Sequence, residues 1–266
     1  MAARVLDGMK RAKKKERQDR ILAELRLSAA IRIPELAESF GVSTETIRRD
    51  LEEMAEDGLI MRTYGGAVVS QLGVEPGWME RDNLMVAERE RIGGLAEQFV
   101  RAREIVMIDA GSTTLHLARR LALADKELTV ITNGINLALE LKDIPGVTVI
   151  LTGGIVTSAS ASIEGLLGAD LLKKIHTDIA FVSARGFSVE DGLTDFSIYE
   201  ADLKHMCIKA SAKTVALVDH TKFDTTSISS YASLDDINMV ITDSGISPET
   251  ADIYEKAGTD IVISGI

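Results

Sequence analysis

The sequence predicts an α/β protein in which an N-terminal winged helix-turn-helix is joined to a larger α/β domain with a mostly parallel sheet. Three observations support this fold class. A short helix carrying Arg48 and Arg49 follows a glycine turn and a capping serine. From residue 104 onward, apolar runs alternate with helical patterns. Charge is also divided unevenly along the chain. We expect domains at 1–69 and 81–266, with a linker at 70–80.

The net charge of the whole chain hides this division. It is −11, which by itself argues against nucleic-acid binding, because phosphate contacts need Lys and Arg. Residues 1–66, however, carry 13 basic and 12 acidic residues, and the first twenty carry 8 basic against 3 acidic. Residues 67–266 carry 17 basic and 29 acidic residues. This asymmetry is typical of a nucleic-acid-binding segment attached to an acidic domain.

Composition excludes several other classes of protein. Cys207 is the only cysteine, so neither an intramolecular disulfide nor a cysteine-based zinc cluster can form. The four histidines are scattered without metal-ligand spacing. No apolar run approaches the ~18 residues of a membrane span, and the first residues are charged rather than apolar as in a signal segment. We therefore expect a cytoplasmic protein with no metal, no cofactor and no membrane partner.

The first elements predict the helix-turn-helix. Apolar residues at helical spacing indicate a first helix over 17–29. Pro34 suits the first turn of a second helix, where its missing N–H costs nothing, and Gly41 suits a left-handed helix stop. Ser43 is placed to cap a third helix over 44–57. Two short helices joined by a tight glycine turn make a helix-turn-helix.

The third helix has one apolar and one polar face. At 100° per residue, Ile47, Leu51 and Met54 form the buried stripe, while Glu45 lies at 160° and Arg49 at 200° from Ile47. Arginine binds guanine O6 and N7 as well as phosphate. Recognition helices contact bases through their N-terminal residues. The outward residues expected to bind DNA in the first two turns are Thr44, Thr46, Arg48 and Arg49.

The next apolar stretches, over 59–69, surround Gly65-Gly66 and predict a β-hairpin that forms the wing. Arg62 and Tyr64 would contact the DNA backbone or minor groove, and the basic run at 13–15 would contact phosphates. The alternative is a small helical domain with solvated arginines. The complete set of predicted DNA-binding residues is Lys13, Lys14, Lys15, Ser43, Thr44, Thr46, Arg48, Arg49, Arg62 and Tyr64.

The second domain is expected to alternate strands and helices. A helix over 82–103 comes first, although Gly93 and Gly94 within it cost ~1 kcal/mol each, which only close packing would explain. The predicted strands are 104–109, 128–132, 147–152, 178–183, 214–219, 240–242 and 261–263. The remaining predicted helices are 112–123, 137–141, 166–175, 199–212 and 248–257. Apolar strands alternating with helices indicate a parallel sheet covered on both faces.

Polar residues gather where these strands end, and open α/β sheets bind ligands at the carboxyl ends of their strands. A helix that opens after Gly111 offers free N–H groups and a positive dipole end to a phosphate. Asp109 would hydrogen-bond sugar hydroxyls, and Lys222 would add a positive charge. The strand-end residues expected to bind a small molecule are Asp109, Gly111, Ser112, Thr113, Thr114, Thr132, Asn133, Gly153, Gly154, Arg185, Asp219 and Lys222.

Both parts of the sequence resemble the DeoR family of bacterial transcription regulators. The run Thr46-Ile-Arg-Arg-Asp-Leu51 carries the resemblance in the first domain, and Asp109-Ala-Gly-Ser-Thr-Thr114 and Leu151-Thr-Gly-Gly154 carry it in the second. The resemblance implies a sensor domain similar in fold to sugar-phosphate isomerases, with a phosphorylated sugar as effector. It also adds Glu200 and Lys204 to the expected effector-binding residues.

The sequence departs from the family pattern at three positions. Tyr64 stands where an imidazole is common, Arg89 where the family often has lysine, and Arg185 in a turn that is often smaller and less basic. Arg185 is therefore a candidate for the choice of effector.

The resemblance implies a DNA-binding repressor of a carbohydrate-utilisation operon that is released by a phosphorylated sugar, while activation stays open. One winged domain reads few base pairs, so we expect a homodimer or homotetramer on repeated half-sites. The alternative is an isomerase- or deaminase-like enzyme with an accessory DNA-binding domain. Asp109, His116, Glu200 and Asp219 would be available for its acid–base chemistry. Since neither nucleophile nor metal-ligand spacing appears, we expect no enzyme activity.

Overall fold

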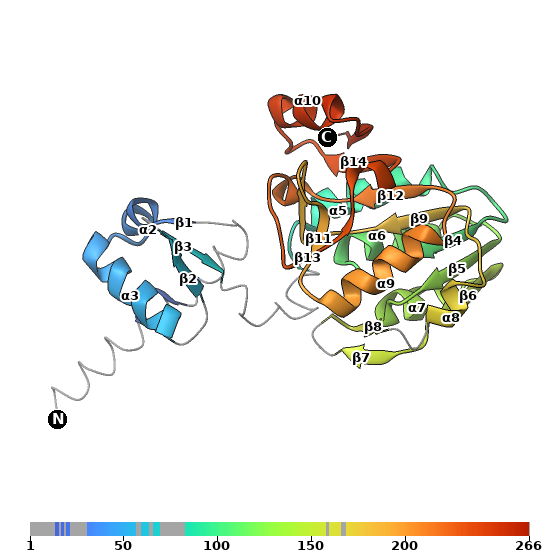
Figure 1. The fold of residues 1–266 in the computed structure, drawn as a ribbon, viewed down its shortest axis with the longest axis horizontal. Coiled ribbons are helices and arrows are strands. Elements are labelled where there is room, and N and C mark those ends of the chain that lie inside the picture. Colours follow the sequence, from blue (N-terminus) through green and yellow to red (C-terminus); the bar gives the residue numbers. More distant parts are fainter. Residues whose placement is uncertain are drawn as a thin grey trace. The chain divides into compact units, whose positions relative to one another are not determined.

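The structure is a computed structural model that describes residues 14–15, 17–18, 20–21, 31–56, 60–63, 66–69, 83–157, 160–165 and 169–265. The chain divides into two compact units, Met1–Glu75 and Pro76–Ile266 (Figure 1). The expected linker at 70–80 lies outside the described residues, as do Lys13 and Tyr64.

The first unit contains the predicted helix-turn-helix and wing. Helices α2 (Ile33–Phe40) and α3 (Thr44–Glu56) are joined by a turn at Gly41, whose φ of 61° is left-handed. Strands β2 (Ile60–Thr63) and β3 (Gly66–Val69) form the expected antiparallel hairpin. A short strand, β1 (Ile31–Arg32), pairs with β3 and was not predicted, since two residues leave no periodic signal.

The core of this unit is the apolar stripe expected from helical spacing. Ile47, Leu51 and Met54 of α3 are buried against Leu36 of α2 and against Ile21. The described residues among 14–21 are helical, so helical structure is present before the predicted start at residue 17. The Ser43 Oγ accepts the Thr46 backbone N–H at 3.1 Å, which confirms the predicted cap.

A seven-stranded parallel sheet forms the second unit. Its strands are β4 (Ile105–Ile108), β5 (Leu128–Thr132), β6 (Val147–Leu151), β9 (Ile179–Val182), β12 (Thr214–Leu217), β14 (Met239–Asp243) and β15 (Ile261–Ser264). Their spatial order is β15-β14-β12-β9-β4-β5-β6. After β4 the chain adds β5 and β6 on one side of that strand, and it then places β9 on the other side. The sheet therefore has a topological switch point between β4 and β9, where such sheets bind ligands.

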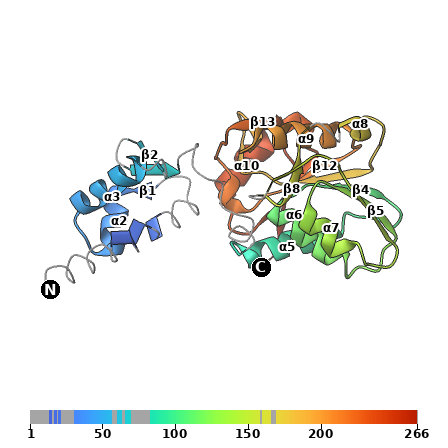
Figure 2. The ribbon, with the colours of Figure 1, turned by 90° about the horizontal axis from the view of Figure 1, so that it is seen from below.

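Helices cover both faces of this sheet. Figure 2 shows α5 (Val86–Glu97), α6 (Ser112–Leu121) and α7 (Ile135–Leu141) on one face, and α8 (Ala169–Leu172) and α9 (Ile198–Lys209) on the other. The strand alternation fits these layers. In β4, Val106 and Ile108 belong to the cluster that contains Leu117 of α6, whereas Met107 packs with Leu203 and Cys207 of α9. The last helix, α10 (Pro248–Lys256), contributes Ala251 and Tyr254 to a third cluster.

Two small antiparallel elements were not predicted. Strands β10 (Gly186–Ser188), β11 (Gly192–Asp195) and β13 (Ser229–Ala232) form a separate sheet, and β7 (Ile155–Thr157) pairs with β8 (Ser162–Glu164). These strands have only three or four residues and lack an apolar alternation. Partners distant in sequence hold them in place, as when β11 pairs with β13. Short 3-10 turns at His220–Lys222 and Leu234–Asp236 were also missed.

The helix predicted over 82–103 was too long. It begins after Met85, which has a left-handed φ of 51°, and is capped at Gln98. Close packing explains one of the two glycines in this helix, Gly93. A Cβ on Gly93 would lie 2.6 Å from the His116 backbone carbon, so only glycine allows α5 to approach α6 this closely.

Candidate functional site

The outward face of α3 carries a glutamate–arginine pair. The Arg49 Nε lies 3.3 Å from the Glu45 Oε1, and the two side chains are 75% and 60% exposed. Thr44 and Arg48 are exposed beside them. The Thr46 hydroxyl lies 2.9 Å from the Ser43 hydroxyl, so these two predicted contacts also belong to the helix cap. The residues predicted on this helix therefore do form one polar surface.

Basic side chains of the preceding segment contact the acidic second half of α3. Arg17 forms a two-point ion pair with Asp50, with Nε–Oδ2 and Nη2–Oδ1 distances of 2.6 and 3.2 Å. Lys14 pairs with Glu53, which also accepts a hydrogen bond from Gln18. These hydrogen bonds, first that of Lys14, lower the pKa of Glu53. Sequence reasoning assigned Lys14 to phosphate and did not foresee this pairing within the domain.

Lys15 is exposed, as the predicted phosphate contact requires. The backbone of Arg62 lies in β2, while its side chain lies outside the described part of the chain.

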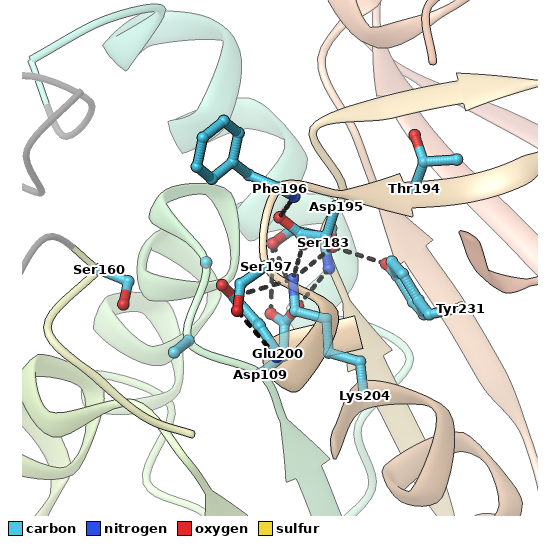
Figure 3. Close-up of polar contacts among 12 residues, drawn as sticks. Asp109, Ser160, Ser183, Thr194, Asp195, Phe196, Ser197, Glu200, Lys204 and Tyr231 are labelled. Carbon is cyan, nitrogen blue, oxygen red and sulfur yellow. Dashed lines mark hydrogen bonds and ion pairs between the residues drawn. The ribbon is translucent and has the colours of Figure 1, made fainter. Parts of the chain in front are cut away.

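At the sheet's switch point, Asp109 at the end of β4 meets Ser183 at the end of β9. The Ser183 backbone N–H donates to the Asp109 Oδ2 at 2.8 Å, and its hydroxyl donates to the same carboxylate. Figure 3 shows this contact together with Lys204, whose ammonium lies among the carboxylates of Asp109, Asp195 and Glu200. The predicted Asp109, Glu200 and Lys204 are thus brought together by β4 and α9.

Lys204 is almost fully buried and has four close oxygen partners. Its Nζ lies 2.9 Å from Asp109, 2.6 Å from Asp195 and 3.3 Å from Glu200, and it donates to the Ser183 carbonyl at 2.9 Å. Burial alone would lower the pKa of Lys204, but the three carboxylates outweigh it and hold the pKa well above its ordinary value. The ammonium therefore stays charged and links the main sheet to β11.

The loop that opens α6 is fitted closely to this cluster. The Thr114 Oγ1 accepts the Gly111 N–H at 2.9 Å and donates to the Asp109 carbonyl at 2.9 Å. A Cβ on Gly111 would overlap the Ser183 hydroxyl. Thr113 and Thr114 are buried, whereas Ser112 is half-exposed at the first turn of α6. Ser112 is therefore the residue of this loop that is most exposed to solvent.

Asn133 connects the ends of neighbouring strands. Its Oδ1 accepts the Ala110 N–H at 2.9 Å, and its Nδ2 donates to the Ile163 carbonyl at 3.2 Å. The Thr132 hydroxyl accepts the Gly134 N–H at 3.0 Å at the start of α7. Both predicted side chains thus shape the edge of the sheet. Gly153, by contrast, is exposed, and an added Cβ would meet only open space.

Sequence reasoning missed a hydroxyl-lined carboxylate beside this edge. Glu164, at the end of β8, is buried and accepts hydrogen bonds from Ser160 at 3.3 Å and from Ser197 at 2.9 Å. Ser197 also caps α9 by accepting the Glu200 N–H. The preference of serine for helix caps is the one local signal that could have singled it out. Gly154 packs so closely on Glu164 that a Cβ would lie 2.5 Å from its carbonyl oxygen.

Asp219, after β12, is buried beside Arg89 of α5 at an Oδ2–Nη2 distance of 3.3 Å. Burial raises the pKa of Asp219, but Lys222, Arg89 and the Thr221 hydroxyl outweigh it and lower the pKa overall. Lys222 and Arg185 are half-exposed. The departure noted at position 89 therefore places a guanidinium in a buried ion pair.

The predicted effector residues fall into two groups by burial. Those enclosed by protein are Asp109, Gly111, Thr113, Thr114, Thr132, Asn133, Glu200, Lys204 and Asp219. Those that reach solvent are Ser112, Gly153, Gly154, Arg185 and Lys222. The first group packs inside the carboxyl edge of the sheet, and the second is exposed to solvent there.

Within the described residues, no three His, Cys, Asp or Glu side chains gather as a metal site would require. No helix there has the length and apolar character needed to cross a membrane.

Residues 85–244 match the family described as the DeoR C terminal sensor domain, and residues 17–71 match the DeoR-like helix-turn-helix domain. The chain is 41% identical over 250 residues to the HTH-type transcriptional regulator GolR of Listeria innocua, covering 94% of this chain and 98% of that protein. It is 30% identical over 231 residues to the glycerol-3-phosphate regulon repressor of Escherichia coli K12, covering 87% and 91%.

A helix-turn-helix DNA-binding domain joined to a sensor domain defines a ligand-responsive transcription regulator. The chain belongs to the DeoR family of DNA-binding transcriptional regulators.

Among solved structures, ribose 5-phosphate isomerase A from Neisseria gonorrhoeae has a TM-score of 0.40 and 16% identity, covering 55% of each chain. The eIF2B beta structure from Chaetomium thermophilum has a TM-score of 0.42 and 13% identity, covering 77% of this chain and 56% of that one.

Proposed function

We propose that the protein is a repressor of a carbohydrate-utilisation operon and that a phosphorylated sugar, bound in the second unit, releases it from its operator. The observation that carries the proposal is the set of solvent-reaching groups along the carboxyl edge of one parallel sheet. The names of the protein's relatives support the proposal, since one relative is named a glycerol-3-phosphate regulon repressor. As expected from sequence, the domains would span 1–69 and 81–266 around a linker at 70–80.

The phosphate of the effector would bind at the first turn of α6. Free backbone N–H groups and the helix dipole favour an anion there, and Ser112 adds a half-exposed hydroxyl. Lys222 and Arg185 would supply local positive charge in a unit whose net charge is negative. The hydroxyl groups of the sugar would lie toward Gly153 and Gly154, where the backbone reaches solvent.

The operator would be read by the outward face of α3. Thr44, Arg48 and Arg49 are exposed in the first two turns of this helix, and recognition helices contact bases through their N-terminal residues. Lys15 and Arg62 would contact phosphates. Since one reading head specifies few base pairs, we propose that a homodimer or homotetramer in the cytoplasm binds repeated half-sites.

We also propose that the second unit senses its ligand without converting it. The carboxylates of Asp109 and Glu200 are already engaged by Lys204, and Asp219 is engaged by Arg89. None of the three is positioned as an unengaged general base.

A panel of sugar phosphates tests the function. The correct effector at 100 times its Kd should stabilise the protein by about 2.7 kcal/mol and raise its melting temperature. It should also release the protein from an operator duplex selected from random DNA. Turnover of any sugar phosphate in the same samples would contradict the absence of enzyme activity, and release by none of them would contradict the class of effector.

A further inference from the structure

We propose that Glu45 is a positioning residue for base reading: it orients Arg49, so that the two side chains act as one recognition unit on the operator. The proposal rests on the proposed placement of Arg49 in the major groove. It goes further by assigning a favourable role to an acidic residue on a surface that faces DNA.

The geometry of α3 places both side chains on the face that reads DNA. Ile47 and Leu51 are fully buried, and they fix the orientation of the helix against α2. Glu45 and Arg49 are one turn apart, on the opposite side of the helix, with side chains 60% and 75% exposed. Any duplex that meets Arg49 therefore also meets Glu45.

The atoms that form the ion pair leave the reading end of the arginine available. Glu45 contacts Arg49 through its Oε1 and the arginine Nε, at 3.3 Å. Guanidinium has five N–H donors in a rigid plane, so four remain on the two Nη atoms. These form the end-on fork that matches guanine O6 and N7. Holding Nε restricts the plane of the guanidinium and reduces the conformational freedom that would be lost on binding.

Two other acidic residues of α3 pair with basic residues from outside this helix. Asp50 and Glu53 are paired with Arg17 and Lys14, which come from the preceding segment. Those contacts neutralise charge inside the domain. Glu45 instead engages the arginine proposed to read a base.

Simple electrostatics and this proposal predict different results for the ratio of operator affinity to random-DNA affinity, since repulsion acts equally on both duplexes and leaves that ratio unchanged. A carboxylate near phosphates is repelled, so its removal should strengthen binding to any duplex. If Glu45 orients Arg49, its removal should weaken the preference for the operator over random DNA. The quantity to measure is therefore the ratio of the two affinities in the full-length protein, using an operator selected from random duplexes.

Glu45→Ala should lower this ratio about 10-fold, and Glu45→Gln, which keeps an acceptor for Nε, should restore part of it. Glu52→Ala provides a matched control, because it removes the same charge from the same helix two turns farther on. It should leave the ratio unchanged. In the Arg49→Ala background, Glu45→Ala should have no further effect on the ratio. Circular dichroism should show equal helix content in all variants.

An unchanged or increased ratio for Glu45→Ala would overturn the proposal, as would an equal loss with and without Arg49. Failure of the underlying assignment would look different: Arg49→Ala would then retain full preference for the operator.

Discussion

At the scale of single residues, the second unit depends on charges that water cannot reach. Asp219 and Arg89 are both nearly inaccessible and contact each other. Removing one partner of a buried pair leaves the other charge uncompensated, which costs far more than the loss of a surface pair. Arg89 therefore has a structural function, which is to compensate the buried charge of Asp219.

Arg89→Ala should destabilise the protein by about 3 kcal/mol at neutral pH. The pKa of Asp219 is lower in the folded protein than in the unfolded chain, so the ionised carboxylate stabilises the native state at pH values above the ordinary aspartate pKa. This stabilisation is lost as the pH falls through the lowered pKa. Without Arg89 the pKa of Asp219 rises, so the destabilisation should shrink as the carboxyl becomes protonated toward pH 4. Urea unfolding at pH 7 and pH 4 measures this.

Arg103→Ala is the matched control, because Arg103 pairs with Glu127 on the surface at 84% and 69% exposure. Its effect should stay near zero at both pH values. An Arg89→Ala variant as stable as wild type at pH 7 would contradict the assignment.

Gly111 is restricted by contact rather than by backbone strain, since its φ of −99° suits any residue. Gly111→Ala should displace the Ser183 hydroxyl from Asp109 and weaken effector binding, while operator affinity without effector stays at the wild-type level. Calorimetric titration with the effector and a DNA-binding assay separate the two. Gly265→Ala, where an added Cβ meets nothing within 4 Å and which lies outside the proposed effector site, should leave both effector and operator binding unchanged and serves as the control.

At the scale of elements, α9 joins the main sheet of the second unit to the small β10-β11-β13 sheet. Its Leu203 and Cys207 pack on the main sheet, and Lys204 on the same helix connects Asp109 after β4 with Asp195 in β11. One lysine faces three carboxylates, so the cluster relies on the ammonium to limit repulsion among acids. Lys204 therefore helps to hold the small sheet at the switch point, together with Tyr231 of β13, whose hydroxyl donates to the Ser183 carbonyl at 2.6 Å.

Lys204→Met should destabilise the protein by about 3–5 kcal/mol, because it leaves three carboxylates without their cation. The raised pKa of Lys204 means that this stabilisation is fully present below its ordinary pKa and is lost only as pH rises through the higher folded value. The loss should therefore be seen in full at pH 7, by chemical denaturation.

Lys209→Met, on the same helix, removes an exposed lysine that pairs with Asp236 at 2.8 Å. It should cost less than about 1 kcal/mol. It should also raise the pKa of Asp236 from about 2, because the Lys209 hydrogen bond is the largest cause of that low value. Similar losses for the two methionine variants would argue against a special role of Lys204.

At the scale of the whole molecule, charge separates the two functions. The net charge of −11 comes from the second unit, while the first twenty residues are basic. The acidic unit therefore discourages nonspecific contact with DNA, and the proposed anionic effector would have to be held by local groups. In the first unit, part of the basic charge is already used, since Lys14 and Arg17 pair with acids of α3.

Lys15→Ala should reduce the slope of log K against log salt by about 0.9 for operator binding, because one phosphate contact is lost. Lys222→Ala, in the second unit, should leave the slope unchanged and weaken effector binding. Filter binding or anisotropy across a salt series measures both. An operator affinity independent of salt would contradict the proposed division of charge.

The sequence by itself determined the elements whose causes are local. The Ser43 cap, the Gly41 stop and the stripe of Ile47, Leu51 and Met54 define the helix-turn-helix, because capping and helical periodicity act within a few residues. Continuous apolar runs defined the parallel strands, and the polar residues after them indicated the edge where we propose that the effector binds.

Only the tertiary structure decided which of these polar residues are enclosed and which reach solvent. The contact of Asp109 with Ser183 spans 74 positions, and Tyr231 of β13 reaches the Ser183 carbonyl from 48 positions away. Glu164, at the end of β8, is contacted by Ser197 at the start of α9, 33 positions away. Contacts between residues so distant in sequence depend on the order of the strands in the sheet and on the side from which each connection returns to it. No periodicity or capping preference encodes these features.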